Sequence, residues 1–429
     1  MSSFQLNKKG DYILLDPALF GDFSVIKYGI PFFKEGNDIN LLVNSKNEAS
    51  YKIANYNSKI FSIEDDDFAE KLYFINNYEL WSCKKSFEKE APIRAILDFI
   101  LVQSLMKNVS DIHFDCVDTS SYVVRFKIDT VLHDFVFLNR EQGEAVLMRL
   151  KVLCGADTAK KHLPQSASFY RNFRNKDVDF RFSTHPTFLG ERCVIRVLQE
   201  KNLLPIDRIG LRDEVLEIAR KVIEEPYGFV IFTGPTNSGK TTTIHSILKE
   251  ISKSGVNIMT LEDPVEYRIP GIVQTTVSES GLSFLDGMKS ILRQDPNVIF
   301  LGEIRDEKTA QMAAQAAMVG HKVLTTLHAY SIKGAINRLS DMGVSLKILA
   351  ESLLAIFSQR LVRKVEEKDG ENFFNGLTLV SDGCYFDEEL RDILREGKVP
   401  NIENKLREIA MDLVEKKVTT FEEVKRVIG

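Results

Sequence analysis

Apolar residues recur along this chain with two different spacings. After Pro92 they return every three or four positions as far as Met106, which predicts a helix with the proline in its first turn. Alternating, β-branched segments then predict three strands, at residues 122–126, 178–182 and 193–198. We therefore expect a small α+β domain at residues 91–202.

The second half of the chain changes to a strand–helix alternation. Pro205 and its polar neighbours interrupt both spacings and predict a linker at residues 203–207. Four short apolar runs follow, at residues 229–233, 258–261, 298–301 and 323–327. Runs of this kind separated by helices predict an α/β core with a mostly parallel sheet at residues 208–365. Ligands of such sheets bind beyond the carboxyl ends of the strands, so the residues after each run are the candidates for chemistry.

The two ends of the chain show weaker patterns. Residues 1–90 contain short β-type runs such as residues 12–15 and no chemical motif, so we treat them as a separate N-terminal domain. Amphipathic patterns at residues 388–394 and 406–414 predict a helical C-terminal region from residue 366 to 429. The longest apolar runs are far shorter than the roughly 20 residues that span a bilayer, and no export signal precedes them, so we expect a cytoplasmic protein.

The charge balance and the cysteine content exclude several classes of protein. Lys plus Arg total 56 against 61 Asp plus Glu, a net charge of −5. This balance lacks the basic excess of a dedicated nucleic-acid binder, so no direct contact with nucleic acid is expected. The five cysteines include no C-x-x-C pair, which disfavours both a disulfide framework and a zinc site.

The strongest motif follows the first apolar run and satisfies G-x-x-x-x-G-K-[ST]. Backbone amides of such a loop and of the next helix bind phosphates, Lys240 reaches the β- and γ-phosphates, and the Thr241 hydroxyl ligates Mg²⁺. ATP and Mg²⁺ are therefore the predicted ligands. The predicted nucleotide-binding residues are Gly234, Pro235, Thr236, Asn237, Ser238, Gly239, Lys240, Thr241 and Thr242.

Acidic residues follow two further runs. Glu303 comes after residues 298–301, where a carboxylate can hold the magnesium shell or the attacking water; the alternative is a solvated surface carboxylate. Glu262 and Asp263 end another run, and Pro264 turns the chain away there. Glu262 is the candidate for deprotonating water and Asp263 for positioning, although the pattern leaves these roles exchangeable.

The fourth run ends at His328. A lone histidine is more often a plain hydrogen-bonding residue, but its place at a strand end of this sheet makes a phosphate-sensing role an equal alternative.

Four motifs in this order resemble one family, the secretion ATPases of bacterial type II secretion and type IV pilus assembly (the GspE/PulE/PilB group). The four are the glycine-rich loop, an acidic box, the segment around Glu303 and a histidine box, at residues 234–241, 260–266, 292–306 and 320–328. The resemblance extends from about residue 90 to the end of the chain. It implies a RecA-like P-loop NTPase core, preceded by a small α+β domain and followed by a helical appendage.

The resemblance also implies roles for particular residues. Glu262 is expected to act as general base and Glu303 to hold the Mg²⁺ environment. Arg181 and Arg196 are expected to reach the nucleotide from the N-terminal α+β domain; taken alone, each reads as a solvent-exposed or ion-paired arginine. The family further implies a homohexamer that docks on an inner-membrane platform protein and drives pilus or pseudopilus assembly, peripheral to the membrane.

Two departures from the family pattern and three alternatives remain. Most assembly ATPases carry two C-x-x-C pairs after the Gln359–Leu361 segment, and none is present here, so no zinc site is expected. Residues 1–90 do not resemble the family's first N-terminal domain, which leaves the docking partner open. The alternatives are a pilus-retraction ATPase, a conjugation-type secretion ATPase, and a nucleotide-binding regulatory subunit that does not hydrolyse ATP.

Overall fold

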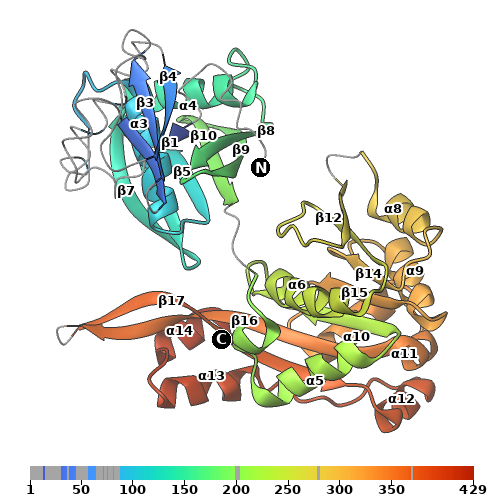
Figure 1. Cartoon of the computed structure of the whole chain (residues 1–429). Helices are drawn as coiled ribbons and strands as arrows, with labels where there is room; N and C mark the ends of the chain where they lie inside the picture. Colours follow the sequence, from blue (N-terminus) through green and yellow to red (C-terminus); the bar gives the residue numbers. More distant parts are fainter. Residues whose placement is uncertain are drawn as a thin grey trace. The chain divides into compact units, whose positions relative to one another are not determined.

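The computed structural model describes two units, Met1–Glu200 and Lys201–Gly429 (Figure 1). The residues it describes are 13–14, 30–35, 38–44, 57–63, 71, 75, 81, 87–198, 203–277, 281–368 and 371–429. Within these ranges no helix combines the length and the apolar character that crossing a membrane requires.

The first unit is built on a seven-stranded sheet with the order β1-β8-β9-β10-β5-β6-β7. Neighbouring strands are antiparallel except for β1 and β8, which are parallel. The strands are β1 (Ile13–Leu14), β5 (Asp111–Cys116), β6 (Ser121–Ile128), β7 (Val131–Asn139), β8 (Gln165–Phe173), β9 (Lys176–Thr187) and β10 (Gly190–Leu198). The predicted strands at 122–126, 178–182 and 193–198 are therefore confirmed.

Two helices, α3 (Ile93–Met106) and α4 (Arg140–Cys154), share one apolar core with this sheet. Pro92 directly precedes α3, as the sequence predicts. Asn139 and Gln142 form a capping box at the start of α4, and Gly155 ends it in the left-handed region with φ of 70°.

A separate three-stranded sheet lies in residues 1–90. It contains β2 (Ile30–Glu35), β3 (Asp38–Asn44) and β4 (Asn57–Ile63), with β2 and β3 antiparallel and β3 and β4 parallel. Trp81 and Leu14 also precede residue 91, yet they are buried in the core formed with α3. Much of the predicted N-terminal domain lies outside the described residues.

The second unit contains a seven-stranded sheet with the order β13-β12-β14-β15-β11-β16-β17. The first six strands in this order run parallel, and β17 pairs antiparallel with β16. The strands are β11 (Gly228–Thr233), β12 (Ile258–Glu262), β13 (Val273–Thr276), β14 (Val298–Leu301), β15 (Lys322–Leu327), β16 (Leu353–Lys368) and β17 (Glu371–Tyr385). All four predicted runs are strands of this sheet.

Helices cover both faces of the sheet, which is why its central strands are continuous apolar runs. On one face, α5 (Asp213–Glu224) and α6 (Lys240–Ile251) share a core with Val230 and Phe232. The opposite face packs Phe229 and Ile231 against another set of helices. That set is α8 (Phe284–Ile291), α9 (Glu307–Met318), α10 (Ile332–Asp341) and α11 (Leu346–Ser352).

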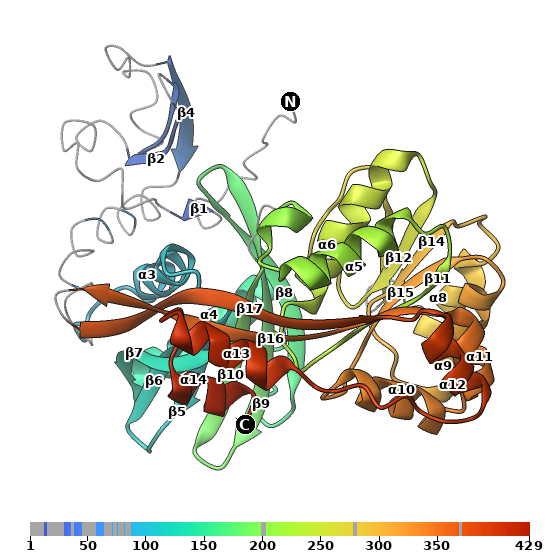
Figure 2. The same ribbon diagram turned by 90° about the horizontal axis from the view of Figure 1, so that it is seen from below.

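The prediction that residues 366–429 are helical is wrong for its first part. β16 runs on to Lys368, and residues 371–385 return as β17, so the two strands form a long ribbon (Figure 2). Pairing with β16, a strand of the core sheet, determines this conformation, and a local pattern does not reveal such a partner. Helices follow as expected: α12 (Glu388–Arg395), α13 (Leu406–Glu415) and α14 (Phe421–Val427).

Candidate active site

The loop between β11 and α6 makes a tight turn at the carboxyl end of the parallel sheet. Gly234 and Gly239 have φ values of 147° and 89°, which glycine adopts at little cost. A Cβ atom on Gly234 would lie 2.4 Å from the carbonyl oxygen of Gln359, so a larger residue does not fit there. Thr236 and Asn237 are exposed at the tip of the loop. Strand, loop and helix thus follow one another as a phosphate-binding loop requires.

Lys240, the first residue of α6, is buried within the loop. Its Nζ donates to the carbonyl oxygens of Gly234 and Pro235, at 2.9 and 2.7 Å, and lies 3.5 Å from Ser238 Oγ. Burial, and after it the neighbouring positive charge of Arg360, lowers the pKa of Lys240 to about 8. A buried ammonium among carbonyl groups is suited to receiving phosphate oxygens.

The N-terminus of α6 adds further donors. No side chain of the described ranges caps its first turn, so the amide groups there can meet an anion. Thr241 is partly exposed, and its hydroxyl makes no hydrogen bond to any described residue. Thr242 Oγ1 lies 3.1 Å from the hydroxyl of Tyr267.

Glu303 belongs to a cluster of charged side chains just beyond the end of β14. It forms an ion pair with Arg305, whose Nη2 also lies 3.8 Å from Asp263 Oδ2. His328 Nε2 lies 3.9 Å from Glu303 Oε2. The side chain of Glu303 is 23% exposed and that of His328 56%, so both groups are accessible to ligands. The structure therefore brings Glu303, Asp263 and His328 together at one edge of the sheet.

Glu262 occupies a very different environment at the end of β12. Its side chain is only 3% exposed and faces α6. Oε1 accepts hydrogen bonds from Thr260 Oγ1 at 2.6 Å and from Gln274 Nε2 at 3.2 Å. Oε2 lies 2.9 Å from His245 Nε2, although the direction of approach is not that of a good hydrogen bond. Both oxygens thus face neighbouring side chains, and only Oε1 accepts well-directed hydrogen bonds from them.

His245 connects Glu262 to the phosphate-binding loop. Its Nδ1 lies 2.8 Å from the carbonyl oxygen of Thr241, which only accepts, so Nδ1 carries a hydrogen. Nε2 faces Glu262 Oε2 at 2.9 Å. Glu262 is therefore in contact with the first turn of α6 through this imidazole.

Arg181 and Arg196 lie in the first unit, directly opposite each other on β9 and β10. Arg196 Nε is 3.1 Å from Asp111 Oδ1, and Lys127 Nζ is 3.8 Å from the other carboxylate oxygen. Asp111 thus lies between two cations, Arg196 and Lys127. The side chain of Arg196 is 58% exposed.

Four residues of the site were not predicted from the sequence. Arg360 and Glu266 act electrostatically on Lys240, and His245 contacts the carbonyl oxygen of Thr241. Gln359 donates from Nε2 to Thr243 Oγ1 at 2.9 Å. Two signals were present: Glu266 belongs to the acidic box, and His245 stands one helical turn after Thr241.

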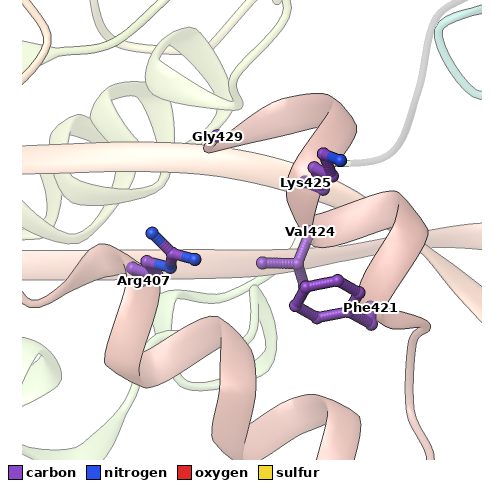
Figure 3. A pocket seen from close by; sticks show the side chains of 5 residues that line it. All are labelled: Arg407, Phe421, Val424, Lys425 and Gly429. Carbon is purple, nitrogen blue, oxygen red and sulfur yellow. The ribbon is translucent and has the colours of Figure 1, made fainter.

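Two hollows lie away from this loop. One, of about 240 Å³, is bordered by α13 and α14, with Phe421 and Val424 beside the cations Arg407 and Lys425 (Figure 3). The other, of about 340 Å³, lies in the first unit next to Lys151. Neither contains the residues of the phosphate-binding loop.

The residues at the loop fit a nucleotide and a hard divalent cation. Gly234 allows a close approach of the backbone, and the buried Lys240 supplies positive charge. Thr241 and Glu303 offer oxygen ligands, and Mg²⁺ is commonly held by one or two protein oxygens together with substrate phosphates. No cluster of three or more His, Cys, Asp or Glu ligands occurs in the part of the chain that the structure describes.

The fold and the loop define an α/β protein of the P-loop class. The chain belongs to the family described as Type II/IV secretion system protein, whose model matches residues 86–426. Type II secretion system protein HxcR of Pseudomonas aeruginosa is 38% identical over 338 residues, which cover 75% of this chain and 71% of that protein.

Two further comparisons agree with this family. Type II secretion system ATPase E of Vibrio cholerae serotype O1 is 39% identical over 279 residues, covering 64% of this chain and 55% of that protein. This chain therefore spans little more than half of that relative. The crystal structure of the pilus retraction motor PilT with bound ADP superposes with a TM-score of 0.58 at 25% identity, covering 77% of this chain and 96% of that one.

Proposed function

We propose that this chain hydrolyses ATP to ADP and phosphate with Mg²⁺ and uses the energy to drive assembly of a pilus or pseudopilus. The observation that carries the proposal is the buried Lys240 inside a glycine loop at the carboxyl end of the sheet, with the accessible Glu303 electrostatically coupled to it. The name of the Vibrio cholerae relative, an ATPase of type II secretion, supports the same reaction.

Binding rests on the loop. The backbone N–H groups of the loop, except at Pro235, which has none, and those of the first turn of α6 orient the phosphates, and Lys240 exchanges its carbonyl partners for phosphate oxygens. Positive charge at this place stabilises the charge that develops on the transferred phosphoryl group.

Thr241 and Glu303 are the proposed ligands of the metal environment, Glu303 through water. When bound, Mg²⁺ neutralises phosphate oxygens and fixes their orientation. Glu303 is also the better placed of the two glutamates to orient the attacking water, because its carboxylate is accessible. His328, close to Glu303, is placed to respond to the γ-phosphate.

Glu262 is proposed to support hydrolysis by positioning a residue of the phosphate-binding site, without contacting the attacking water. Sequence reasoning favours it as general base, but its carboxylate is buried and engaged by Thr260, Gln274 and His245. A base needs a free lone pair within reach of water. We therefore assign Glu262 to positioning Thr241 through His245.

The first unit is proposed to complete the site. Arg181 and Arg196 face each other on neighbouring strands, and the family pattern assigns both to the nucleotide. For these arginines to reach the nucleotide, a first unit and a second unit must close on it, either within one chain or between neighbouring chains. A homohexameric ring would allow this closure. Hydrolysis would then release the contact and move the units.

The proposed setting is the cytoplasmic face of the inner membrane, where the ring docks on a platform protein of a type II secretion, type IV pilus or DNA-uptake machine. The relatives named for type II secretion favour this setting. The likeness to the retraction motor PilT keeps retraction as the second candidate. Direct contact with nucleic acid is not part of the proposal.

Phosphate release by the purified chain tests the proposal. We expect Mg²⁺-dependent turnover of ATP that Lys240→Ala abolishes, because the variant lacks the phosphate-binding ammonium. Lys249→Ala, which removes an exposed lysine of the same helix, serves as the matched control and should retain turnover. Unchanged turnover in Lys240→Ala, or none in the wild type, would refute the assignment.

A further inference from the structure

β16 runs beside the phosphate-binding loop and touches it with three consecutive residues. The carbonyl oxygen of Gln359 packs against Gly234, and the side chain of Gln359 donates a hydrogen bond to Thr243 of α6. Leu361 lies within 3.7 Å of the place where a Cβ of Gly239 would be. Arg360 stands between these two contacts, so its position relative to the loop is fixed on both sides.

The guanidinium of Arg360 is buried against the loop, with the residue only 5% exposed. Nη1 donates to the carbonyl oxygen of Gln359 at 2.9 Å, and Nη2 donates to that of Tyr330 at 3.1 Å. Nη1 also lies 3.1 Å from the place where a Cβ of Gly234 would be, next to the first glycine of the loop.

Arg360 and Lys240 are two buried cations in one small volume. In the described ranges neither forms an ion pair with a carboxylate: backbone carbonyl oxygens accept from both, and Glu303 and Glu266 act on Lys240 only through electrostatics. Burying charge without an opposite charge is costly, and two like charges raise that cost. Such an arrangement is stabilised when an anion enters between them.

We propose that Arg360 is a second phosphate-binding cation of this site, contributed by the same chain as Lys240. The inference rests on the proposed function, since it assumes a nucleotide at the loop. An arginine suits the task because its planar fork donates to carbonyl groups on one edge and keeps other N–H groups for phosphate oxygens. The P-loop unit then holds the polyphosphate with two cations before any arginine of the first unit arrives.

The alternative is that Arg360 only ties β16 to the segment that carries His328 and Tyr330. The two roles predict opposite effects of Arg360→Gln. If Arg360 is purely structural, the variant should be less stable than the wild type and bind nucleotide with unchanged affinity. If Arg360 binds phosphate, the variant without nucleotide should be at least as stable as the wild type, because repulsion with Lys240 is removed, but its affinity for nucleotide should be weaker.

The test measures the dissociation constants of ATP and ADP, and the melting temperature with and without ADP, for the wild type and Arg360→Gln. We expect affinity for both nucleotides to fall about 10- to 100-fold, which is the usual value of a hydrogen bond to a charged group. The rise in melting temperature that ADP produces should shrink accordingly, with no loss of stability in its absence.

Arg363→Gln is the matched control. Arg363 lies three residues further along β16 and pairs with Glu423, so this variant should melt earlier and bind nucleotide as the wild type does. Unchanged nucleotide affinity in Arg360→Gln would overturn the inference. If that variant does not fold, Arg360→Lys decides, because a cation at this position must preserve the effect of ADP on melting. A wild type that binds neither nucleotide would refute the proposed function instead.

Discussion

Two glutamates at neighbouring strand ends have different surroundings, although the sequence presents them alike. Glu303 is accessible and pairs with Arg305, whereas Glu262 is buried and bound by three side chains. Their substitutions should therefore affect catalysis for different reasons.

Replacing Glu303 by glutamine should leave ATP binding intact and lower kcat by about 10²- to 10⁴-fold, since the amide neither accepts a proton nor holds the metal environment. Single-turnover hydrolysis together with equilibrium binding of ATP measures both effects. A variant with unchanged turnover would show that Glu303 is a surface carboxylate.

Glu262→Gln and His245→Gln should lower kcat to a similar extent, because each breaks the same connection to the Thr241 carbonyl. The double variant should then be little worse than either single variant, as expected for residues that act as one unit. If Glu262 is the general base instead, Glu262→Gln alone will abolish turnover and His245→Gln will retain most of it.

At this scale the sequence predicts which residues gather at the loop but not how each is paired. The order of strand, glycine loop and helix places Lys240 and Thr241 from local spacing alone. Arg360 escapes such reasoning because β16 meets the loop through sheet pairing with β11, more than one hundred residues away in the chain. The burial of Glu262 depends in the same way on His245 and Gln274 from other elements.

Among the elements, the β16–β17 ribbon and α14 are joined by one buried carboxylate. Glu423 accepts from the backbone amide of Arg363, from its guanidinium at 2.7 Å and from Arg426 at 2.6 Å. Apolar residues of both strands and of α13 and α14 surround this contact, Val362 and Val380 among them. The contact fastens the C-terminal helices to the ribbon.

The stability of this junction should depend on pH. Burial alone would raise the pKa of Glu423, but hydrogen bonds from Arg426 and Arg363 outweigh it and lower the pKa to about 2. Because the folded pKa lies below the ordinary value near 4.3, the stabilisation is present above that value and is lost as pH falls toward 2.

Urea unfolding followed by circular dichroism at pH 7, 4.5 and 3 measures this dependence. At pH 7, Glu423→Gln should destabilise the junction by about 3 kcal/mol, as expected when one partner of a buried ion pair is removed. The difference between wild type and variant should narrow below pH 4.5. A constant difference across this range would contradict the assignment.

The ribbon also occupies the place where the family pattern has its cysteine pairs. From residue 364 onward the chain has only Cys384 and no histidine, whereas a structural zinc needs about four such ligands. We therefore expect no stoichiometric zinc in the purified protein. Elemental analysis that finds one zinc per chain would overturn this prediction.

The sequence predicts whether a segment is a helix or a strand wherever the spacing of apolar residues within that segment determines its conformation. α3, α12 and α13 fall where helical spacing predicts them, and the four parallel strands fall on continuous apolar runs. β17 does not, because residues 371–385 mix polar residues and glycine among apolar ones and become a strand only through the ladder with β16.

At the scale of the whole molecule, the chain consists of two units that each carry part of the proposed chemistry. The second unit holds Lys240, Arg360 and Glu303, and the first holds the facing arginines Arg181 and Arg196. A requirement for both units would couple the proposed ATP hydrolysis to their relative movement, and this coupling would make the chain a motor.

The rate of ATP hydrolysis by Arg196→Ala, measured beside Arg181→Ala on protein whose oligomeric state and ATP affinity are known, tests this requirement most directly. Loss of an arginine that stabilises the transition state costs about 10³- to 10⁵-fold in rate. We predict a loss of that order in both variants, with the ring and ATP binding retained. Near wild-type hydrolysis in both variants, or full activity in a stable monomer, would contradict it.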